Sequence, residues 1–169
     1  MQKDTHTGQH DNHQQPDGAM NKHHYLRLLL MTVLSFVSMY VLMYAMANTF
    51  ANVYSNLNQV YMAGLMTAPM VLIELALMSA MYRDRKLNAA IAVVSLLAVV
   101  GCWFLIRQQT AIADRQFLKS MIPHHAGAIL MCREAAITDA EIKELCAKII
   151  AGQEAEIRQM KEKLNELEK

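Results

Sequence analysis

The stretch Leu26–Ala47, LRLLLMTVLSFVSMYVLMYAMA, decides the fold class of this chain. Arg27 is its single charged residue, and its length matches the roughly 20 apolar residues that a helix needs to cross a bilayer. A signal peptide is the competing interpretation, because Ala45-Met46-Ala47 resembles a small-x-small cleavage site. A signal peptide has a shorter apolar core, so we expect an uncleaved transmembrane helix.

Two more stretches, residues 60–82 and residues 87–106, are apolar over a similar length. The earlier one is interrupted only by Pro69 and the ionisable Glu74, and the later one carries Trp103, a residue common at membrane interfaces. We predict an all-α protein in which three transmembrane helices are followed by an extramembrane helical hairpin. The helices are expected at about 26–47, 60–82 and 87–106, within a membrane region of residues 25–106.

The charges beside these stretches predict an orientation. The loop between the first two stretches carries no charge, whereas the opposite side is basic, with Lys22, Arg27, Arg83, Arg85 and Lys86. Basic loops stay on the cytoplasmic side of a membrane. We therefore expect a protein of the bacterial inner (cytoplasmic) membrane, with a cytoplasmic amino terminus and residues 107–169 in the periplasm.

Residues 1–24 are polar and rich in histidine, and we expect them to form a disordered cytoplasmic tail. Neutral imidazoles can hold a divalent metal weakly, but the spacing of these histidines is irregular. The histidines of the tail are His6, His10, His13, His23 and His24.

Residues 107–169 are charged and predict a helical hairpin. We expect its first helix to continue from the third span to Met121 and to restart at Pro123, where proline is tolerated in a first turn. Thr138 or Asp139 then caps the second helix. Two such helices cannot close a core, so we expect half of a ferritin-like four-helix bundle, completed by homo-oligomerisation as a dimer or higher oligomer. The second helix carries an apolar stripe of Ile150, Ile157, Met160, Leu164 and Leu167. In the alternative of a purely structural module, this stripe mediates partner association.

Soft metal ligands concentrate in the segment Met121–Cys132, MIPHHAGAILMC. On one helix its sulfur and imidazole side chains fall within an arc of roughly 120°; they are Met121, His124, His125, Met131 and Cys132. Such a set suits copper, particularly Cu(I), better than calcium or magnesium. The alternative is that the histidines cap a helix and the methionines fill a core.

The second helix supplies an opposing wall. If the hairpin turns near Ile137, His125 lies opposite Ile150. Met121 then lies near Glu154. Gln153 and Glu156 then become candidates to orient the imidazole nitrogens by hydrogen bonding.

Three interpretations are open for Cys132. It is a metal ligand, a disulfide partner of Cys146 outside the cytoplasm, or a core residue. Cys102 is the third cysteine, and the three sit in no zinc-binding pattern.

The residues around MIPHH resemble the domain of unknown function 305 family, over about Ala113 to Leu164. The pattern is Asp114-x-x-Phe117-Leu118-x-x-MIPHH-x-x-Ala128-Ile129-x-Met131, followed by Ile149-Ile150-x-x-Gln153-x-x-Glu156-Ile157-x-x-Met160. The resemblance implies a helical, ferritin-like, extracytoplasmic domain associated with copper binding and copper tolerance, with no firmly assigned catalysis. Its implied ligands are Met121, His124, His125, Met131 and Met160, with Asp114 as a supporting carboxylate. Cys132 and Cys146 stand where small apolar residues are expected.

Methionines also recur inside the membrane region. A stripe on the second span consists of Met62, Met66, Met70, Glu74 and Met78. An intramembrane Glu is costly and marks a possible functional path, here for metal transport. The alternative is that Glu74 pairs with Tyr40 or Tyr44 while the methionines fill gaps between helices.

The leading expectation is a copper-binding membrane protein that buffers, stores or hands over periplasmic copper. The 14 methionines fit this function, and lipid, a second copy and periplasmic copper-handling proteins are its expected partners. A net charge of +1 gives no reason to expect nucleic acid. We do not expect the protein to be an enzyme, because the sequence shows no recognisable nucleophile with an activating base.

Overall fold

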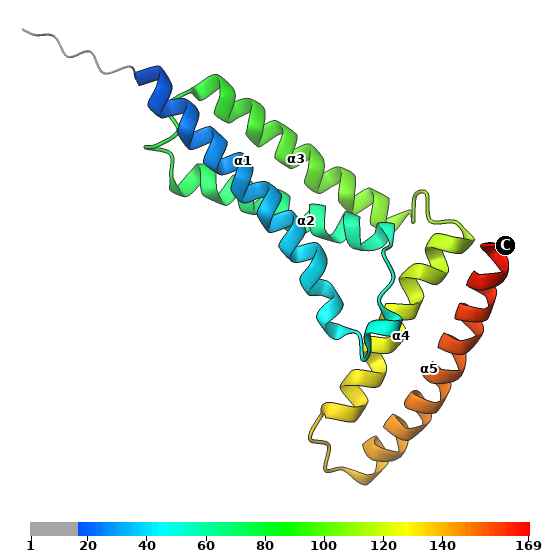
Figure 1. Cartoon of the computed structure of the whole chain (residues 1–169). Coiled ribbons are helices and arrows are strands. Elements are labelled where there is room, and N and C mark those ends of the chain that lie inside the picture. The colour runs from blue at the N-terminus through cyan, green and yellow to red at the C-terminus, as the bar shows by residue number, and fades with distance from the viewer. Residues whose placement is uncertain (1–16) are drawn as a thin grey trace, which may run out of the picture.

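The computed structural model describes residues 17–169, all of whose regular elements are helical. The predicted all-α fold is therefore confirmed (Figure 1). Its elements are α1 (Asp17–Leu42), the 3-10 turns η1 (Met43–Met46) and η2 (Phe50–Asn52), α2 (Leu57–Leu77), α3 (Arg85–Arg107), α4 (Asp114–Glu134) and α5 (Ala140–Leu167).

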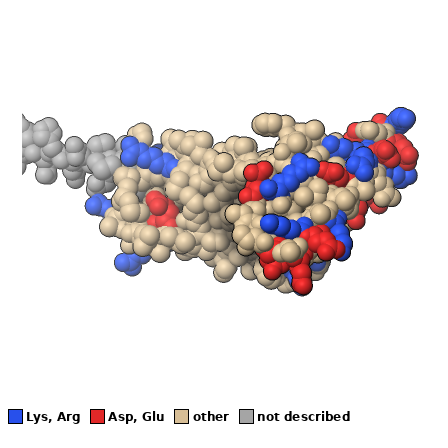
Figure 2. Space-filling view, turned by 90° about the horizontal axis from the view of Figure 1, so that it is seen from below, with Lys and Arg blue, Asp and Glu red and all other residues tan. Residues whose placement is uncertain are grey.

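Three of these helices are long and apolar enough to cross a membrane, as predicted. They cover Lys22–Met46, Leu57–Leu77 and Arg85–Arg107, and α2 packs against both α1 and α3. Figure 2 shows basic side chains at the end of this group from which the grey residues extend, and mixed charges over the hairpin. The surface between them is largely uncharged, as a membrane-embedded surface requires.

The last eight residues of the predicted disordered tail are helical. α1 begins at Asp17, so residues 17–24 are helical because they extend the first apolar helix by two turns. On α1, His23 is exposed and His24 is half-buried. The other histidines of the predicted tail, His6, His10 and His13, lie outside the described residues.

α2 and α3 approach each other closely at Gly64. A Cβ atom at this position would lie 2.9 Å from Cys102 Sγ, a distance at which one of the two groups has to move. Small residues permit this kind of close contact between membrane helices.

We expect Gly64→Ala to lower the unfolding free energy by about 1–3 kcal/mol through overpacking. Gly64→Ala combined with Cys102→Ala should recover most of this loss, because the second change removes the sulfur atom. Thermal unfolding in detergent of the unchanged chain, the two single variants and the double variant measures the coupling between the two positions. Equal effects of Gly64→Ala with and without Cys102 would contradict the contact.

Glu74 pairs with a different tyrosine from the predicted ones. Its Oε1 accepts a hydrogen bond of 3.3 Å from Tyr82 Oη, in the turn after α2. Tyr44 instead donates to the carbonyl of Tyr54, and Tyr40 bonds to Ser55. The pairing with Tyr40 or Tyr44 was wrong because these residues lie at the other end of α1, beside the loop between α1 and α2.

The chain turns sharply between α3 and α4, so the predicted continuous helix to Met121 is wrong. Gln109 and Ala111 have positive φ angles of 49° and 60°, which residues with a Cβ rarely adopt. The turn redirects the chain, and α4 crosses the ends of α1 and α2 (Figure 1).

α4 runs without interruption through Pro123, where a new helix was predicted to begin. Because proline has no N–H group, the carbonyl of Lys119 has no helical donor. Asn56 fills this role from the loop before α2, since its Nδ2 lies 3.4 Å from the oxygen of Lys119. The Asn56 side chain is buried, and its Oδ1 also caps α2 by accepting from the N–H of Gln59.

Two further hydrogen bonds attach the start of α2 to α4. The N–H of Leu57 donates to Gln116 Oε1 at 3.0 Å. Asn58 Nδ2 donates to Ser120 Oγ at 3.2 Å. The polar loop between the first two apolar helices is therefore the surface on which the hairpin is docked.

The hairpin of α4 and α5 has one compact core. Its buried residues are Ile122, Ala126, Ile129, Ile157 and Leu164. Ala47 and Tyr54, from the loop region between α1 and α2, also pack against this core. The hairpin thus covers part of its apolar surface within the same chain, while completion by a second copy stays a prediction.

The register of the hairpin differs from the predicted one. The turn extends to Asp139, which caps α5 by accepting from the N–H groups of Glu141 and Ile142. Because the turn is later than expected, His125 faces Glu156 instead of Ile150.

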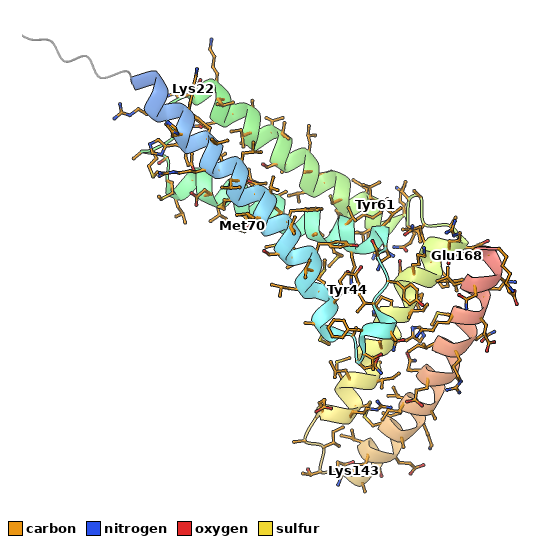
Figure 3. The ribbon with its side chains drawn as sticks, in the orientation of Figure 1. Lys22, Tyr44, Tyr61, Met70, Lys143 and Glu168 are labelled. Carbon is orange, nitrogen blue, oxygen red and sulfur yellow. A yellow bond between two sulfur atoms is a disulfide. The ribbon has the colours of Figure 1, made fainter. Side chains whose placement is uncertain are left out.

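Ion pairs confirm the shifted register. Glu154 pairs with Arg133 instead of lying near Met121. At the other end, Glu168 lies 3.1 Å from both Lys119 and Arg115 (Figure 3). These two cations hold the pKa of the Glu168 carboxyl below its usual value.

Candidate metal centre

A cavity of about 500 Å³ lies where the end of α1, the start of α2 and the side of α4 meet. Tyr44 in Figure 3 marks the end of α1 that faces α4. Its lining residues are Met43, Met46, Ala47, Asn56, Asn58, Gln59, Met62, Ser120, Met121, Pro123, His124, Gly127, Ala128 and Met131.

Three of the predicted ligands line this cavity from α4. Met121, His124 and Met131 fall within an arc of about 80° at 100° per residue. Met121 is half-buried, whereas His124 and Met131 are exposed. The spacing inferred from the sequence therefore places two thioethers and one imidazole on the same wall of the cavity.

His125 lies on the hairpin side of α4 and not in the cavity. Its Nδ1 is 2.9 Å from the carbonyl oxygen of Met121, and its Nε2 is 2.8 Å from Glu156 Oε2. Both ring nitrogens thus face oxygen atoms on the hairpin side, and neither is directed into the cavity. Only His124 of the two predicted histidines lines the cavity, and a site shared by both histidines stays a prediction. The expected contact of Glu156 with an imidazole is present.

The remaining predicted ligands lie elsewhere. Cys132 and Cys146 form a disulfide, so one of the three interpretations is confirmed and Cys132 offers no thiolate. Met160 packs against the hairpin core. Asp114 lies in the first turn of α4, about 15 Å along the helix axis from His124.

Gln153 lies beside Glu156, at the same carboxylate oxygen that contacts His125. Its Nε2 is 3.5 Å from Glu156 Oε2 on the same helix. A supporting role for these two residues around a metal stays a prediction.

The methionines of the predicted stripe on α2 lie in different surroundings in the structure. Met62 lines the cavity, but Met66 and Met78 are 47% and 39% exposed on the outer surface. Met70 is half-buried in the middle of α2 (Figure 3). A transport path along this stripe therefore stays a prediction, with only its first methionine at the cavity.

The sequence reasoning missed Met43, Met46 and Gln59 as parts of the cavity. Met43 and Met46 had a visible signal, because they follow Met39 in a stripe on the first span. Nothing in the local sequence shows that α4 returns to this end of α1.

The cavity is lined by soft ligands and by no charged side chain. Its lining contains thioethers, one imidazole, amides and a hydroxyl, without a carboxylate, an amine or a free thiol. Within residues 17–169 there is no group of three His, Cys, Asp or Glu side chains that could hold a metal. A lining of this kind favours a soft ion such as Cu(I) over calcium, magnesium or carboxylate-bound zinc.

Comparison with known proteins gives two matches. The profile of the family described as Domain of unknown function (DUF305) matches residues 74–164. The chain is also similar to an uncharacterized protein of Acanthamoeba polyphaga mimivirus, with 34% identity over 142 residues that cover 82% of this chain and 91% of that protein. No solved structure matches the chain.

Proposed function

Because this chain belongs to the family called Domain of unknown function (DUF305), whose name assigns no activity, we propose a function from the cavity beside α4. The protein binds copper as Cu(I) at the membrane surface and buffers, stores or hands over the metal, which supports copper tolerance. It acts by binding and not by catalysis.

The observation that carries this proposal is that Met121, His124 and Met131 all line one uncharged cavity. Thioethers and neutral imidazole are ligands that Cu(I) accepts, and hard cations bind them poorly. The cavity opens at the surface, since His124 and Met131 are exposed. A metal held there can exchange with a partner protein without a large rearrangement.

The proposed location is the bacterial inner membrane, with the amino terminus in the cytoplasm and the hairpin in the periplasm. Two observations support it. Basic residues gather at the end of the apolar helices opposite the hairpin (Figure 2), which is typical of a cytoplasmic side. The disulfide of Cys132 and Cys146 is typical of an oxidising compartment.

The proposed partners are periplasmic copper-handling proteins and further copies of this chain. Ile142 and Leu145 of α5 are 49% and 55% exposed, and they offer an apolar surface for association. If association were the whole function, the chain would form oligomers without affinity for copper.

His124 and His125 provide a matched pair for testing copper binding. We expect His124→Ala to weaken Cu(I) binding by the full chain in detergent at least about tenfold, a loss at the lower end of that seen for residues that support metal sites. His125→Ala should change the affinity little, because both nitrogens of His125 already face oxygen atoms. Competition with a chromophoric Cu(I) chelator under anaerobic conditions measures both.

Absence of Cu(I) binding by the unchanged chain would overturn the proposed function. A loss with His125→Ala and not with His124→Ala would move the metal to the hairpin side of α4.

A further inference from the structure

We propose that Met43, Met46 and Met62 of the apolar helices are copper ligands together with the residues of α4. The metal site then belongs to both parts of the chain and exists only while the hairpin is docked. This inference rests on the proposed function and assigns the other half of its site. The three methionines lie outside the region of family similarity, residues 74–164.

The end of α1 places two of these methionines on the same side. Met43 and Met46 are the first and last residues of the 3-10 turn η1. Side chains three residues apart are eclipsed in a 3-10 helix, whereas they diverge by about 60° in an α-helix. The change in helix type therefore directs both thioethers towards the cavity that they line.

Small residues bring α4 against this turn. Gly127 is buried, and a Cβ at this position would lie 3.5 Å from the Met46 carbonyl oxygen and 3.7 Å from Met46 Cβ. The helix backbone of α4 is thus in contact with η1. His124 lies one turn before Gly127 and Met131 one turn after it, so both are beside Met46 along the cavity wall.

α2 contributes the third thioether and an unpartnered oxygen. Met62 and Gln59 are three residues apart on one face of α2, and both line the cavity. Gln59 Oε1 is buried and accepts no hydrogen bond from any described residue. A buried acceptor without a donor is costly, and a water molecule held beside the bound ion would satisfy this oxygen.

The complete lining then presents five thioethers and one imidazole. They belong to Met43, Met46, Met62, Met121, Met131 and His124. Because no charged side chain lines the cavity, a monovalent ion is easier to desolvate there than a divalent one. The site therefore takes the class of soft monovalent cations, Cu(I) and Ag(I), and rejects Zn²⁺.

Two triple variants of the full chain in detergent test this inference. The first is Met43→Leu, Met46→Leu and Met62→Leu, and its matched control is Met66→Leu, Met70→Leu and Met78→Leu. Leucine conserves the volume and removes only the sulfur. We expect the first variant to bind Cu(I) at least about tenfold more weakly and to show weaker copper–sulfur scattering in X-ray absorption, while the control behaves like the unchanged chain in both measurements.

A second measurement uses the unchanged chain and does not depend on a triple variant. Methyl-13C-methionine NMR of the unchanged chain, titrated with Ag(I), should shift the resonances of Met43, Met46 and Met62, assigned from single Leu substitutions, but not that of Met78. Unshifted resonances, or Cu(I) affinity unchanged in the first triple variant, would overturn the inference and leave copper on α4 alone. Absence of Cu(I) and Ag(I) binding altogether would refute the proposed function as well.

Discussion

Replacing Cys132 and Cys146 by serine is expected to destabilise the hairpin by about 3 kcal/mol. The disulfide joins residues 14 apart, and closing a loop of about 15 residues removes chain entropy of this size from the opened state. Apolar packing contributes little near the turn of the hairpin, because Ile142 and Leu145 at the start of α5 are exposed. The loss should therefore be felt first at the turn.

Hydrogen exchange of the α4 and α5 amides in detergent measures this effect. A loss of about 3 kcal/mol corresponds to exchange more than 100-fold faster around residues 126–152. Cys102→Ala, which removes a thiol outside the disulfide, is the matched control and should leave hairpin exchange unchanged. Identical exchange in the serine variant and the unchanged chain would show that packing alone holds the hairpin closed.

Asn56→Leu is expected to cost about 2–4 kcal/mol and to loosen the docking of the hairpin. The change removes the N-cap of α2, worth about 1 kcal/mol, and leaves the part-buried carbonyl of Lys119 without a donor, worth about a further 1–3 kcal/mol. Asn56→Asp separates the two effects. Its carboxylate still accepts from the N–H of Gln59 but cannot donate to Lys119.

Thermal unfolding of both variants, together with hydrogen exchange in α4, distinguishes the cap from the attachment. Asn56→Asp should retain the protection of the first turn of α2 and lose protection around Lys119 and Pro123. If Asn56→Asp matched the unchanged chain in both regions, the 3.4 Å contact with Lys119 would contribute no stability.

The sequence predicted the features that depend on local pattern. The apolar stretches around Leu26–Ala47 and the two that follow gave the three long helices, because length and hydropathy are sufficient for a membrane-spanning helix. Asp139 was a predicted cap because its side chain acts within its own turn. On α4, helical spacing alone placed Met121, His124 and Met131 on one side.

The remaining features depend on contacts between distant segments. His125 is one residue from His124, yet the register of α5 turns it towards Glu156, and that register follows from the turn and the disulfide. The cavity needs α4 to return to η1, which follows from the sharp turn at Gln109 and Ala111. Neither residue is of a type that predicts such a turn, since glycine is the usual residue at positive φ.

Asn56 links two events that would otherwise be independent. The same side chain caps the start of α2 by accepting from the N–H of Gln59 and donates to the carbonyl of Lys119 in α4. Fraying of the first turn of α2 and detachment of the hairpin are therefore one opening transition, shared by segments that composition would assign to different domains. At Arg107 the sequence changes from apolar to charged, which corresponds to a change from lipid to water around the chain. The segments that open together lie on both sides of this boundary.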